Sequence, residues 1–584
     1  MVRHISVFLV LCFALSTFGV MVGQELVDIE GRILDEETRE PIAYANVYNK
    51  DLNRGTLSHS DGFFRLAVRD ASDRISISFI GYEEYVMQLE PGKQVYTVYL
   101  KESTIELAEV TIRPKDDSYL YNLIRSCKSS QSRAENSSKA YFELKSYTDG
   151  EQIELVESYF NVDVRGYDVD DLHMKAGRLA LMPMKNQFFG SLGSSRAIIM
   201  LSLFNKSNYF PINPFQLSHY KLKRTFYLSL DNKFLNEVGD SIFVVDYMPK
   251  ANIGEYFEGK VWINATQKSI LKITMNCVDT DRHPFLPIFP HDEILGLSFN
   301  ITQTFNGVDG DVVFNHIDLI YEMDYVRRRY DEENIVVRTE AILYAYDYDQ
   351  AFFIPKFKFY GYDIDDYRKI SAMPYNEFFW KYNDEYGIND SLNSNELFFS
   401  DELTMTNTTM FTNESPAGRS FYEHPYIKWS EEDRIKLRAT TGDAAGSNDP
   451  MTFKSEAYKL AIQIYLDVNS YQDSLDIVTA TIFDPYETFY NLTMDESTYC
   501  FINIYFDLFE IKRREIEQNI RDNCDHEDCI KAIYDELIDQ LEMESQAYLK
   551  AVQRGTNEKA MREYNSIVLR ALGIDNIQLF KPFE

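Results

Sequence analysis

The chain has 584 residues, of which 59 are Lys or Arg and 92 are Asp or Glu, and its formal net charge is −33 at pH 7. This acidic balance disfavours non-specific binding to nucleic acid or anionic lipid, so we expect no nucleic-acid partner. Hydrophobic residues make up 45% of the chain and aromatic residues 14%, which excludes a disordered protein and, with the length, predicts two to four domains.

Residues 1–24 are predicted to be a signal peptide. Arg3 and His4 give a basic start, the stretch 5–22 is mostly apolar, and Gly23 and Gln24 suit a cleavage site. No later segment reaches the roughly 18 apolar residues of a membrane-spanning helix. We therefore expect an exported protein of the periplasm, or one that is associated with the outer membrane or displayed on the cell surface.

Residues 25–113 are predicted to form a small β-sandwich. Apolar and polar residues alternate with period two, and turn signals such as Asp61-Gly62 and Pro91-Gly92 separate the runs. Glycines 31, 55 and 81 are expected at strand ends, where positive φ or a close backbone approach is most often needed. The residues expected to carry this structural motif are Gly31, Pro41, Asn46, Gly55, Thr56, Asp61, Gly62, Phe64, Gly81 and Tyr82.

The order of these residues resembles the carboxypeptidase-regulatory-like (transthyretin-like) domains at the front of many Bacteroidetes envelope proteins, and the wider arrangement resembles the large proteins named after that domain. In zinc carboxypeptidases the module is an accessory sandwich without catalytic residues, so the resemblance implies no peptidase activity. In TonB-dependent transporters the module precedes a plug and a barrel. Here no plug motif follows Ile112 and the chain ends Lys581-Pro582-Phe583-Glu584, so we do not expect a transporter.

Residues 114–139 are predicted to be a helical connector, and residues 140–387 a β-rich domain built around a large curved antiparallel sheet. One predicted hairpin joins the alternating run 257–263 to the run 271–277, and a second joins the run 297–301 to the segment after the turn 306–311. The first hairpin resembles that of the outer-membrane lipoprotein carrier and related half-barrels, in which an open curved sheet covers an apolar cavity.

Residues 388–455 are rich in Asn, Ser, Thr and Gly and are predicted to be a loop or linker, in which Trp429-Ser430-Glu431-Glu432 could start a short helix. Residues 456–584 are predicted to be α-helical, with helices that end near Asn523, Arg554 and Leu572. Cys524 and Cys529 could pair across the turn between two of these helices; the alternative, a metal site of Cys524, His526 and Cys529, matches no standard zinc spacing.

Catalytic motifs are missing from the sequence. There is no Gly-x-Ser-x-Gly elbow, no phosphate-binding Gly-x4-Gly-Lys-Ser/Thr and no His-Glu-x-x-His. The loop 279–293 places His283 and His291 among carboxylates, so it could ligate a metal or serve acid–base chemistry; alternatively, it is a solvated connection between strands. Two similar strings, 166–171 and 361–366, suggest calcium ligands or a coincidence.

Taken together, the sequence favours a non-catalytic exported envelope protein with an adaptor module that binds a partner protein or an apolar ligand. We expect no enzyme activity, no metal and no cofactor. One alternative is a metal-dependent hydrolase that uses the 279–293 loop, which requires His283 and His291 to converge. The other is a glycan-binding surface protein, which requires Tyr or Trp faces to share one concave surface; the chain has three Trp, at 262, 380 and 429.

Overall fold

In the computed structural model, the described residues are 27–102, 118–383, 426–435 and 458–584. Short gaps fall at 53, 60, 182, 185–186, 189–192, 237, 252–253, 288–290, 309–310, 329–332, 349, 360–365, 472–473, 485–487 and 491–494. The predicted signal peptide and nearly all of the predicted linker lie outside the described residues. The chain divides into two compact units, Met1–Thr104 and Ile105–Glu584.

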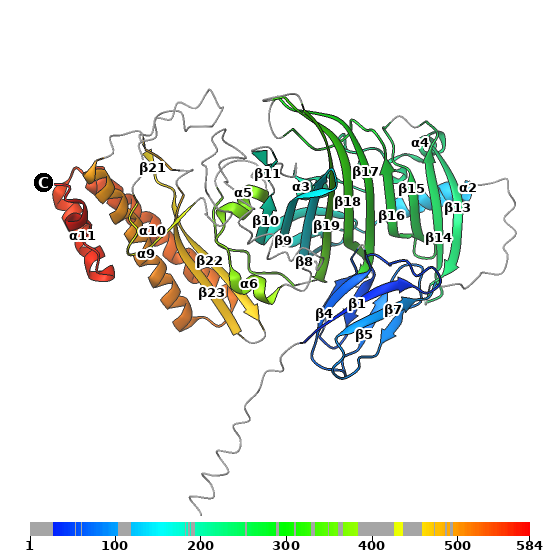
Figure 1. Cartoon of the computed structure of the whole chain (residues 1–584), viewed down its shortest axis with the longest axis horizontal. Coiled ribbons are helices and arrows are strands. Elements are labelled where there is room, and N and C mark those ends of the chain that lie inside the picture. The colour runs from blue at the N-terminus through cyan, green and yellow to red at the C-terminus, as the bar shows by residue number, and fades with distance from the viewer. Residues whose placement is uncertain are drawn as a thin grey trace, which may run out of the picture. The chain divides into compact units, whose positions relative to one another are not determined.

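The first unit contains two small sheets that share one apolar core (Figure 1). One has the order β4-β1-β7 and the other β3-β2-β5-β6. Their strands are β1 (Val27–Asp35), β2 (Asn46–Asn49), β3 (Arg54–Leu57), β4 (Phe63–Val68), β5 (Ile75–Ser78), β6 (Tyr85–Met87) and β7 (Val95–Leu100). Buried Ile33, Phe64 and Val98 from the first sheet pack with Val47 and Ile77 from the second. The predicted small β-sandwich is confirmed.

Two predicted strand-end glycines lie elsewhere. Gly31 is inside β1 and Gly55 is inside β3, so their placement at strand ends is wrong. Gly31 is required by a close approach instead, because a Cβ atom there would lie 2.6 Å from the Phe64 ring and 2.7 Å from the Tyr96 carbonyl oxygen. Gly62 has a positive φ of 78°, which favours glycine.

The second unit is built on a ten-stranded antiparallel sheet in the order β10-β9-β8-β19-β18-β17-β16-β15-β14-β13. In sequence order its strands are β8 (Glu135–Thr148), β9 (Glu151–Arg165), β10 (Asp168–Leu181), β13 (Phe226–Leu235), β14 (Ser241–Pro249), β15 (Gly259–Asn264), β16 (Ser269–Cys277), β17 (Glu293–Val308), β18 (Asp311–Arg327) and β19 (Glu333–Tyr348). Two meanders, β8–β10 and β13–β19, are joined where β19 pairs with β8. The predicted large antiparallel sheet is confirmed, as are both predicted hairpins.

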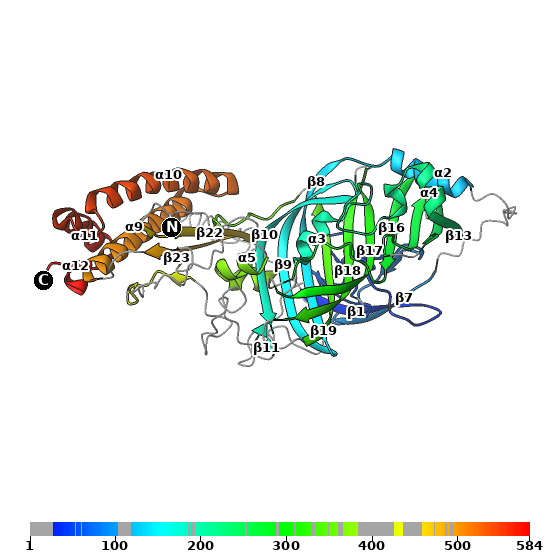
Figure 2. The same ribbon diagram turned by 90° about the horizontal axis from the view of Figure 1, so that it is seen from above.

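The sheet curves, as Figure 2 shows from above. Register shifts interrupt β10 between Met174 and Ala176, and β17 between Ile294 and Gly296. Such β-bulges bend a strand and increase its local twist. The curvature gives the sheet a concave face, and the side chains of that face belong to one large apolar core.

A segment between β10 and β13 packs on this concave face, and we call residues 194–225 the cover segment. It contains α3 (Ser194–Met200), the short 3-10 helix η1 (Pro214–Gln216) and α4 (His219–Thr225). Helix α2 (Ser118–Ser129) packs beside it through Leu120, Ile124 and Cys127. The predicted connector is therefore helical only in its first part, because β8 already starts at Glu135. A small hairpin of β11 (Pro183–Met184) and β12 (Gln187–Phe188) precedes the cover segment.

Beyond β19 the chain forms two short helices, α5 (Asp366–Ala372) and α6 (Glu377–Tyr382). The C-terminal part then begins with strands, namely β20 (Ile427–Lys428), β21 (Tyr458–Lys459), β22 (Ile462–Tyr471), β23 (Ser474–Phe483) and β24 (Phe489–Tyr490). They form the sheets β20-β23-β22 and β21-β24. The helices follow as α9 (Glu496–Asn523), α10 (Glu527–Val552), α11 (Glu558–Leu572) and α12 (Asn576–Phe580).

The prediction of helices is thus confirmed from Glu496 onward, and it is wrong for 458–490. Ile462, Ile464, Leu466 and Val468 alternate with polar or aromatic residues, and this period of two belongs to a strand. The short helix predicted at Trp429 is also wrong. Ser430 accepts hydrogen bonds from the backbone of Glu432 and Asp433, but the backbone there only bends. Cys524 and Cys529 form a disulfide in the turn between α9 and α10.

Candidate functional site

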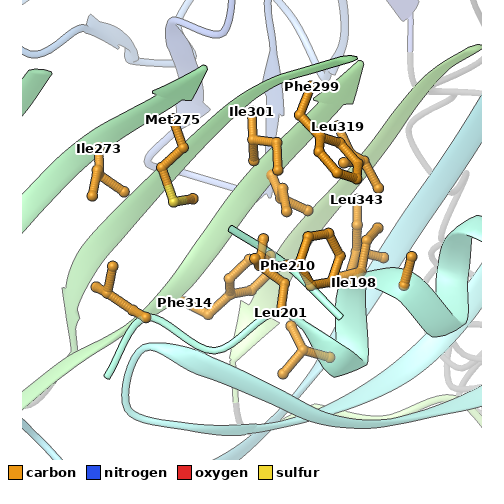
Figure 3. Close-up of a cluster of buried hydrophobic side chains, with 14 of the residues drawn as sticks. Ile198, Leu201, Phe210, Ile273, Met275, Phe299, Ile301, Phe314, Leu319 and Leu343 are labelled. Atoms are coloured by element: carbon orange, nitrogen blue, oxygen red, sulfur yellow. The ribbon is translucent and has the colours of Figure 1, made fainter. Parts of the chain in front are cut away.

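The concave face of the ten-stranded sheet is apolar across most of its width. Ile273, Met275, Phe299, Ile301, Leu319 and Leu343 come from adjacent strands and are all nearly inaccessible to solvent. Figure 3 shows these side chains pointing toward Ile198, Leu201 and Phe210 of the cover segment. The Phe210 and Phe299 rings lie 5.3 Å apart between their centroids. The cover segment therefore occupies the concave face in the position that a second layer would take.

A few polar contacts attach the cover segment to the rest of the sheet domain. The hydroxyls of Ser194 and Tyr321 lie 2.9 Å apart, and burial raises the pKa of Tyr321. The Asp168 carboxylate accepts hydrogen bonds from the Ser202 hydroxyl at 2.7 Å and the Leu203 amide at 3.0 Å. Burial raises the pKa of Asp168, although these two hydrogen bonds oppose the shift.

One carboxylate lies on the apolar side of the sheet. Glu154 is 2% exposed and accepts a 2.7 Å hydrogen bond from the Ser146 hydroxyl. The Ser146 hydroxyl lies 3.0 Å from the hydroxyl of Thr339, on the neighbouring strand β19. Charge buried beside apolar side chains is costly unless it is hydrogen-bonded. We call Glu154, Ser146 and Thr339 the polar spot; they make one part of the concave face polar, whereas the rest is apolar.

The outward face of β8–β10 is also buried, but with charged side chains. Glu143 and Glu157 lie directly opposite each other on β8 and β9. The Tyr141 hydroxyl donates to both carboxylates, at 3.3 and 3.0 Å, and the Arg178 Nε donates to Glu157 at 2.6 Å. Burial raises the pKa of Glu143 to about 7, with Glu157 adding to the effect and Lys145 opposing it.

The segment after β19 covers this charged face. The Arg178 guanidinium lies 4.2 Å from the ring centre of Trp380, and Asn161 exchanges hydrogen bonds with the backbone of Phe352 at 2.9 and 2.8 Å. The cluster is therefore shielded from solvent and forms a structural junction between the sheet and its outer cover. The sequence could have predicted part of this cluster, because the two-residue period of a strand places Tyr141, Glu143 and Lys145 on one face of β8.

A buried ion pair connects the sheet to the C-terminal part. Lys175 is the extra residue of the bulge in β10, and its ammonium group pairs with Asp467 of β22. Both side chains are 1% exposed. The same ammonium donates to the carbonyl oxygens of Phe353 at 3.0 Å and Val468 at 2.9 Å, and Asp467 accepts from Asn376 at 2.9 Å. Burial lowers the pKa of Lys175, and Asp467 opposes that shift.

The 279–293 loop forms no metal site among those of its residues that the structure describes. His283 is half-buried and stacks on Phe285, whereas His291 is exposed. Asp292 accepts hydrogen bonds from the Tyr325 hydroxyl at 2.8 Å and the Arg328 amide at 3.1 Å, which gives it a structural role. Within the described ranges, no group of three or more His, Cys, Asp or Glu is arranged to hold a metal ion.

The string 166–171 forms the turn from β9 into β10, where the Tyr167 hydroxyl accepts from the Ile270 amide at 3.1 Å and Asp168 holds the cover segment. Its counterpart at 361–366 lies outside the described residues except for Asp366. The three tryptophans lie on separate elements. Trp380 is buried against the outward face, Trp429 donates to Asp507 at 2.8 Å, and Trp262 lies in β15 beneath the Lys272 ammonium. They do not share a concave surface.

The motif residues of the N-terminal module occupy its core and turns. Asp61 accepts from the Arg32 guanidinium at 2.8 Å and from the Phe63 amide at 3.0 Å, and the Tyr82 hydroxyl donates to Asp35 at 2.8 Å. Phe64 and Thr56 are buried, Gly81 has a φ of 94°, Asn46 begins β2, and Pro41 forms an isolated bridge with Leu34.

Comparison with known proteins identifies this N-terminal module. Residues 29–112 match the family model of the CarboxypepD_reg-like domain. The match supports the predicted carboxypeptidase-regulatory-like module and covers a small part of the chain. No curated protein matches the chain.

Several solved structures align with more than a third of the chain. They include a DUF1329 family protein from Desulfovibrio piger (10% identity, 39% of this chain and 92% of that chain, TM-score 0.15). A chain of the MucA/MucB complex from Pseudomonas aeruginosa aligns at 6% identity (38% and 92%, TM-score 0.14), and a LolA superfamily protein from Nitrosomonas europaea at 10% identity (39% and 93%, TM-score 0.14). TM-scores this low carry no inference about the ligand or partner of this chain. No helix within the described residues is long and apolar enough to cross a membrane.

Proposed function

We propose that this chain is an exported, non-catalytic binding protein of the cell envelope, and that its ten-stranded sheet holds an apolar ligand on the concave face by displacing residues 194–217 of the cover segment, whereas α4 stays in place. The N-terminal module serves as the adaptor toward an envelope partner. The observation that carries the proposal is the continuous apolar concave face, which is opposed by short helices and loops instead of a second sheet.

The cover segment has the properties of a displaceable layer. Helix α3 has only seven residues, and a helix this short is not stable in water without tertiary packing. The packing of α3 on the sheet is mainly apolar and non-directional, so another apolar surface of similar volume could bury the same strands. An acyl chain or an acylated peptide has such a surface.

The polar spot at Glu154 further restricts the ligand. A molecule that displaces α3 would meet a buried carboxylate and two hydroxyls at one end of an otherwise apolar face. A carboxylate can accept several hydrogen bonds, so a donor on the ligand can bind Glu154 in addition to the Ser146 hydroxyl. We therefore expect an amphipathic ligand with a hydrogen-bond donor at its head and a hydrocarbon body.

Native mass spectrometry of the protein purified from its own envelope tests the proposal. A co-purified lipid or acylated peptide is expected. Its absence together with a stoichiometric metal ion would contradict the proposal and favour the alternative of a metal site at His283 and His291.

A titration with a fluorescently labelled monoacylglycerol, whose headgroup hydroxyls donate hydrogen bonds, tests displacement. Ser194→Ala removes one contact between the cover segment and the sheet. Because such a hydrogen bond contributes about 1 kcal/mol, the open fraction and the apparent affinity should rise about fivefold. Ser566→Ala, on α11, is the matched control and should leave the affinity unchanged. Equal affinities for wild type and Ser194→Ala would contradict displacement of the cover segment.

A further inference from the structure

One long stretch of this acidic chain carries no acidic residue. Between Asp171 and Asp231 the sequence contains no Asp and no Glu, although roughly one residue in six of the whole chain is acidic. The same stretch contains eight basic residues, namely Lys175, Arg178, Lys185, Arg196, Lys206, Lys221, Lys223 and Arg224. The last three lie together in α4 and are exposed, so this helix presents a group of positive charges at the surface.

At that place, α4 and the adjoining ends of β13 and β14 carry basic, tyrosine and methionine side chains that we call the α4–β13 patch (Tyr220, Lys221, Lys223, Arg224, Tyr227, Met248 and Lys250). The Lys250 ammonium lies 4.8 Å from the ring centre of Tyr227 and donates to the Lys223 carbonyl oxygen at 2.7 Å. The Arg224 guanidinium lies 5.5 Å from the ring centre of Tyr220. Figure 1 shows α4 beside β13, the last strand of the sheet.

The apolar members of the patch face solvent. Tyr220 is 68% exposed, Tyr227 is 61% exposed and Met248 is 59% exposed. Tyr227 and Met248 are directly paired across β13 and β14, so their side chains form one continuous surface. Large apolar side chains gathered on a surface and rimmed by polar groups mark an interaction site.

The cations of the patch are available to an external partner. Lys221, Lys223, Arg224 and Lys250 make no ion pair with any carboxylate among the residues that the structure describes. Two acidic groups on these strands, Asp231 and Asp246, lie 2.8 and 3.7 Å from the Lys260 ammonium, which offsets one of their two charges. The patch thus presents uncompensated positive charge on a protein whose net charge is −33.

We propose that the α4–β13 patch docks the protein on the surface of an anionic lipid bilayer. Lysine and arginine side chains attract the charged headgroups, while tyrosine and methionine insert their apolar parts at the level of the headgroups. Both the cations and the exposed apolar side chains of the patch are therefore complementary to the surface of an anionic bilayer. Docking at this edge of the sheet does not depend on the ligand proposed for the concave face.

Vesicle flotation with the mature protein tests the proposal. Binding is expected to phosphatidylcholine vesicles that contain phosphatidylglycerol and not to phosphatidylcholine alone, and it should weaken as salt is added. Changing Lys221, Lys223, Arg224 and Lys250 together to Gln should lower the affinity by several hundredfold, because each cation near such a surface contributes about fivefold. Tyr227→Ser with Met248→Ser should weaken binding in a way that high salt does not remove.

The matched control changes four exposed cations of the C-terminal helical region to Gln (Lys550, Lys559, Arg562 and Lys581). It has the same net charge as the patch variant and should bind like the wild type; both variants should keep the wild-type circular dichroism spectrum and melting temperature. Equal loss in the two variants, or equal binding to neutral and anionic vesicles, would overturn the proposal. Absence of binding to both vesicles would also overturn it, in favour of an acidic protein as the occupant of the patch.

Discussion

Strands β8, β9 and β10 are buried on both faces around Glu143, Glu157 and Arg178, and different interactions stabilise the two faces. The concave face packs apolar side chains such as Phe142 and Phe160 against the cover segment, whereas the outward face buries Glu143, Glu157 and Arg178. Apolar contacts depend on area and volume and tolerate a change of partner. Buried charge pairs tolerate no such change, because each charge needs its own counter-charge and hydrogen bonds. The comparison indicates that the outward face fixes the architecture and the concave face is free to exchange its contents.

The largest expected effect comes from breaking the buried pair between β10 and β22. Lys175→Met leaves Asp467 buried without its counter-charge, so the free energy of unfolding should fall by about 3–5 kcal/mol. Urea unfolding followed by circular dichroism measures this loss. Lys175→Met combined with Asp467→Leu should recover much of it, since no lone charge stays buried. A loss below about 1 kcal/mol in the single variant would contradict the assignment of this pair as a fixed junction.

On the concave face, a truncation should cost less and should be reversible by an added apolar molecule. Phe210→Ala removes a ring that packs on Phe299, and the free energy of unfolding should fall by about 3 kcal/mol. The cavity is apolar, so benzene should bind there and restore part of the loss. Tyr209→Ala, at a half-exposed neighbour, is the control and should change stability by about 0.5 kcal/mol or less. If benzene stabilises the wild type as much as the variant, the stabilisation does not come from binding in the cavity that Phe210→Ala creates.

The charged face should also make stability depend on pH. Burial raises the pKa of Glu143 to about 7, so the folded state holds this proton more tightly than the unfolded state. The resulting stabilisation is present below the unfolded pKa, near 4.5, and is lost as pH rises through 7. Between pH 5 and pH 8, the wild type should therefore lose on the order of 2 kcal/mol more than Glu143→Gln. Parallel pH profiles for the two proteins would show that Glu143 does not titrate in this range.

The smallest effect is expected where a junction contact is exposed. Lys356 pairs with Asp535 of α10 at 2.9 Å, but the two side chains are 30% and 60% exposed. Lys356→Met should lower the free energy of unfolding by about 1 kcal/mol or less. The same urea titration as for Lys175→Met provides the measurement. A loss as large as that of Lys175→Met would mean that burial does not distinguish the two pairs.

The sequence predicted those elements whose evidence is local. The alternation around Val261 and Ile273 gave the β15–β16 hairpin, and the polar turn between Cys524 and Cys529 gave the disulfide as one alternative. The strands at 458–490 were missed because a short apolar alternation next to long amphipathic helices was assigned to the helices. Local pattern alone does not separate the two for runs this short.

The junctions were beyond sequence reasoning for a different reason. Lys175 and Asp467 are separated by 292 residues, and only the bulge in β10 aims the lysine at β22. The cover segment was also unforeseen, because its apolar residues have no long period and its helices have only seven residues each. Tertiary packing, not local propensity, stabilises helices of this length.

Hydrogen exchange with and without a bound monoacylglycerol tests the central claim most directly. If the ligand takes the place of the cover segment, amides of α3 and of residues 202–217 should lose protection on binding, while those of β17 and β18 keep it. Helices that leave the sheet have no other packing to protect them. Unchanged or increased protection of residues 194–217 in the presence of bound monoacylglycerol would contradict the account.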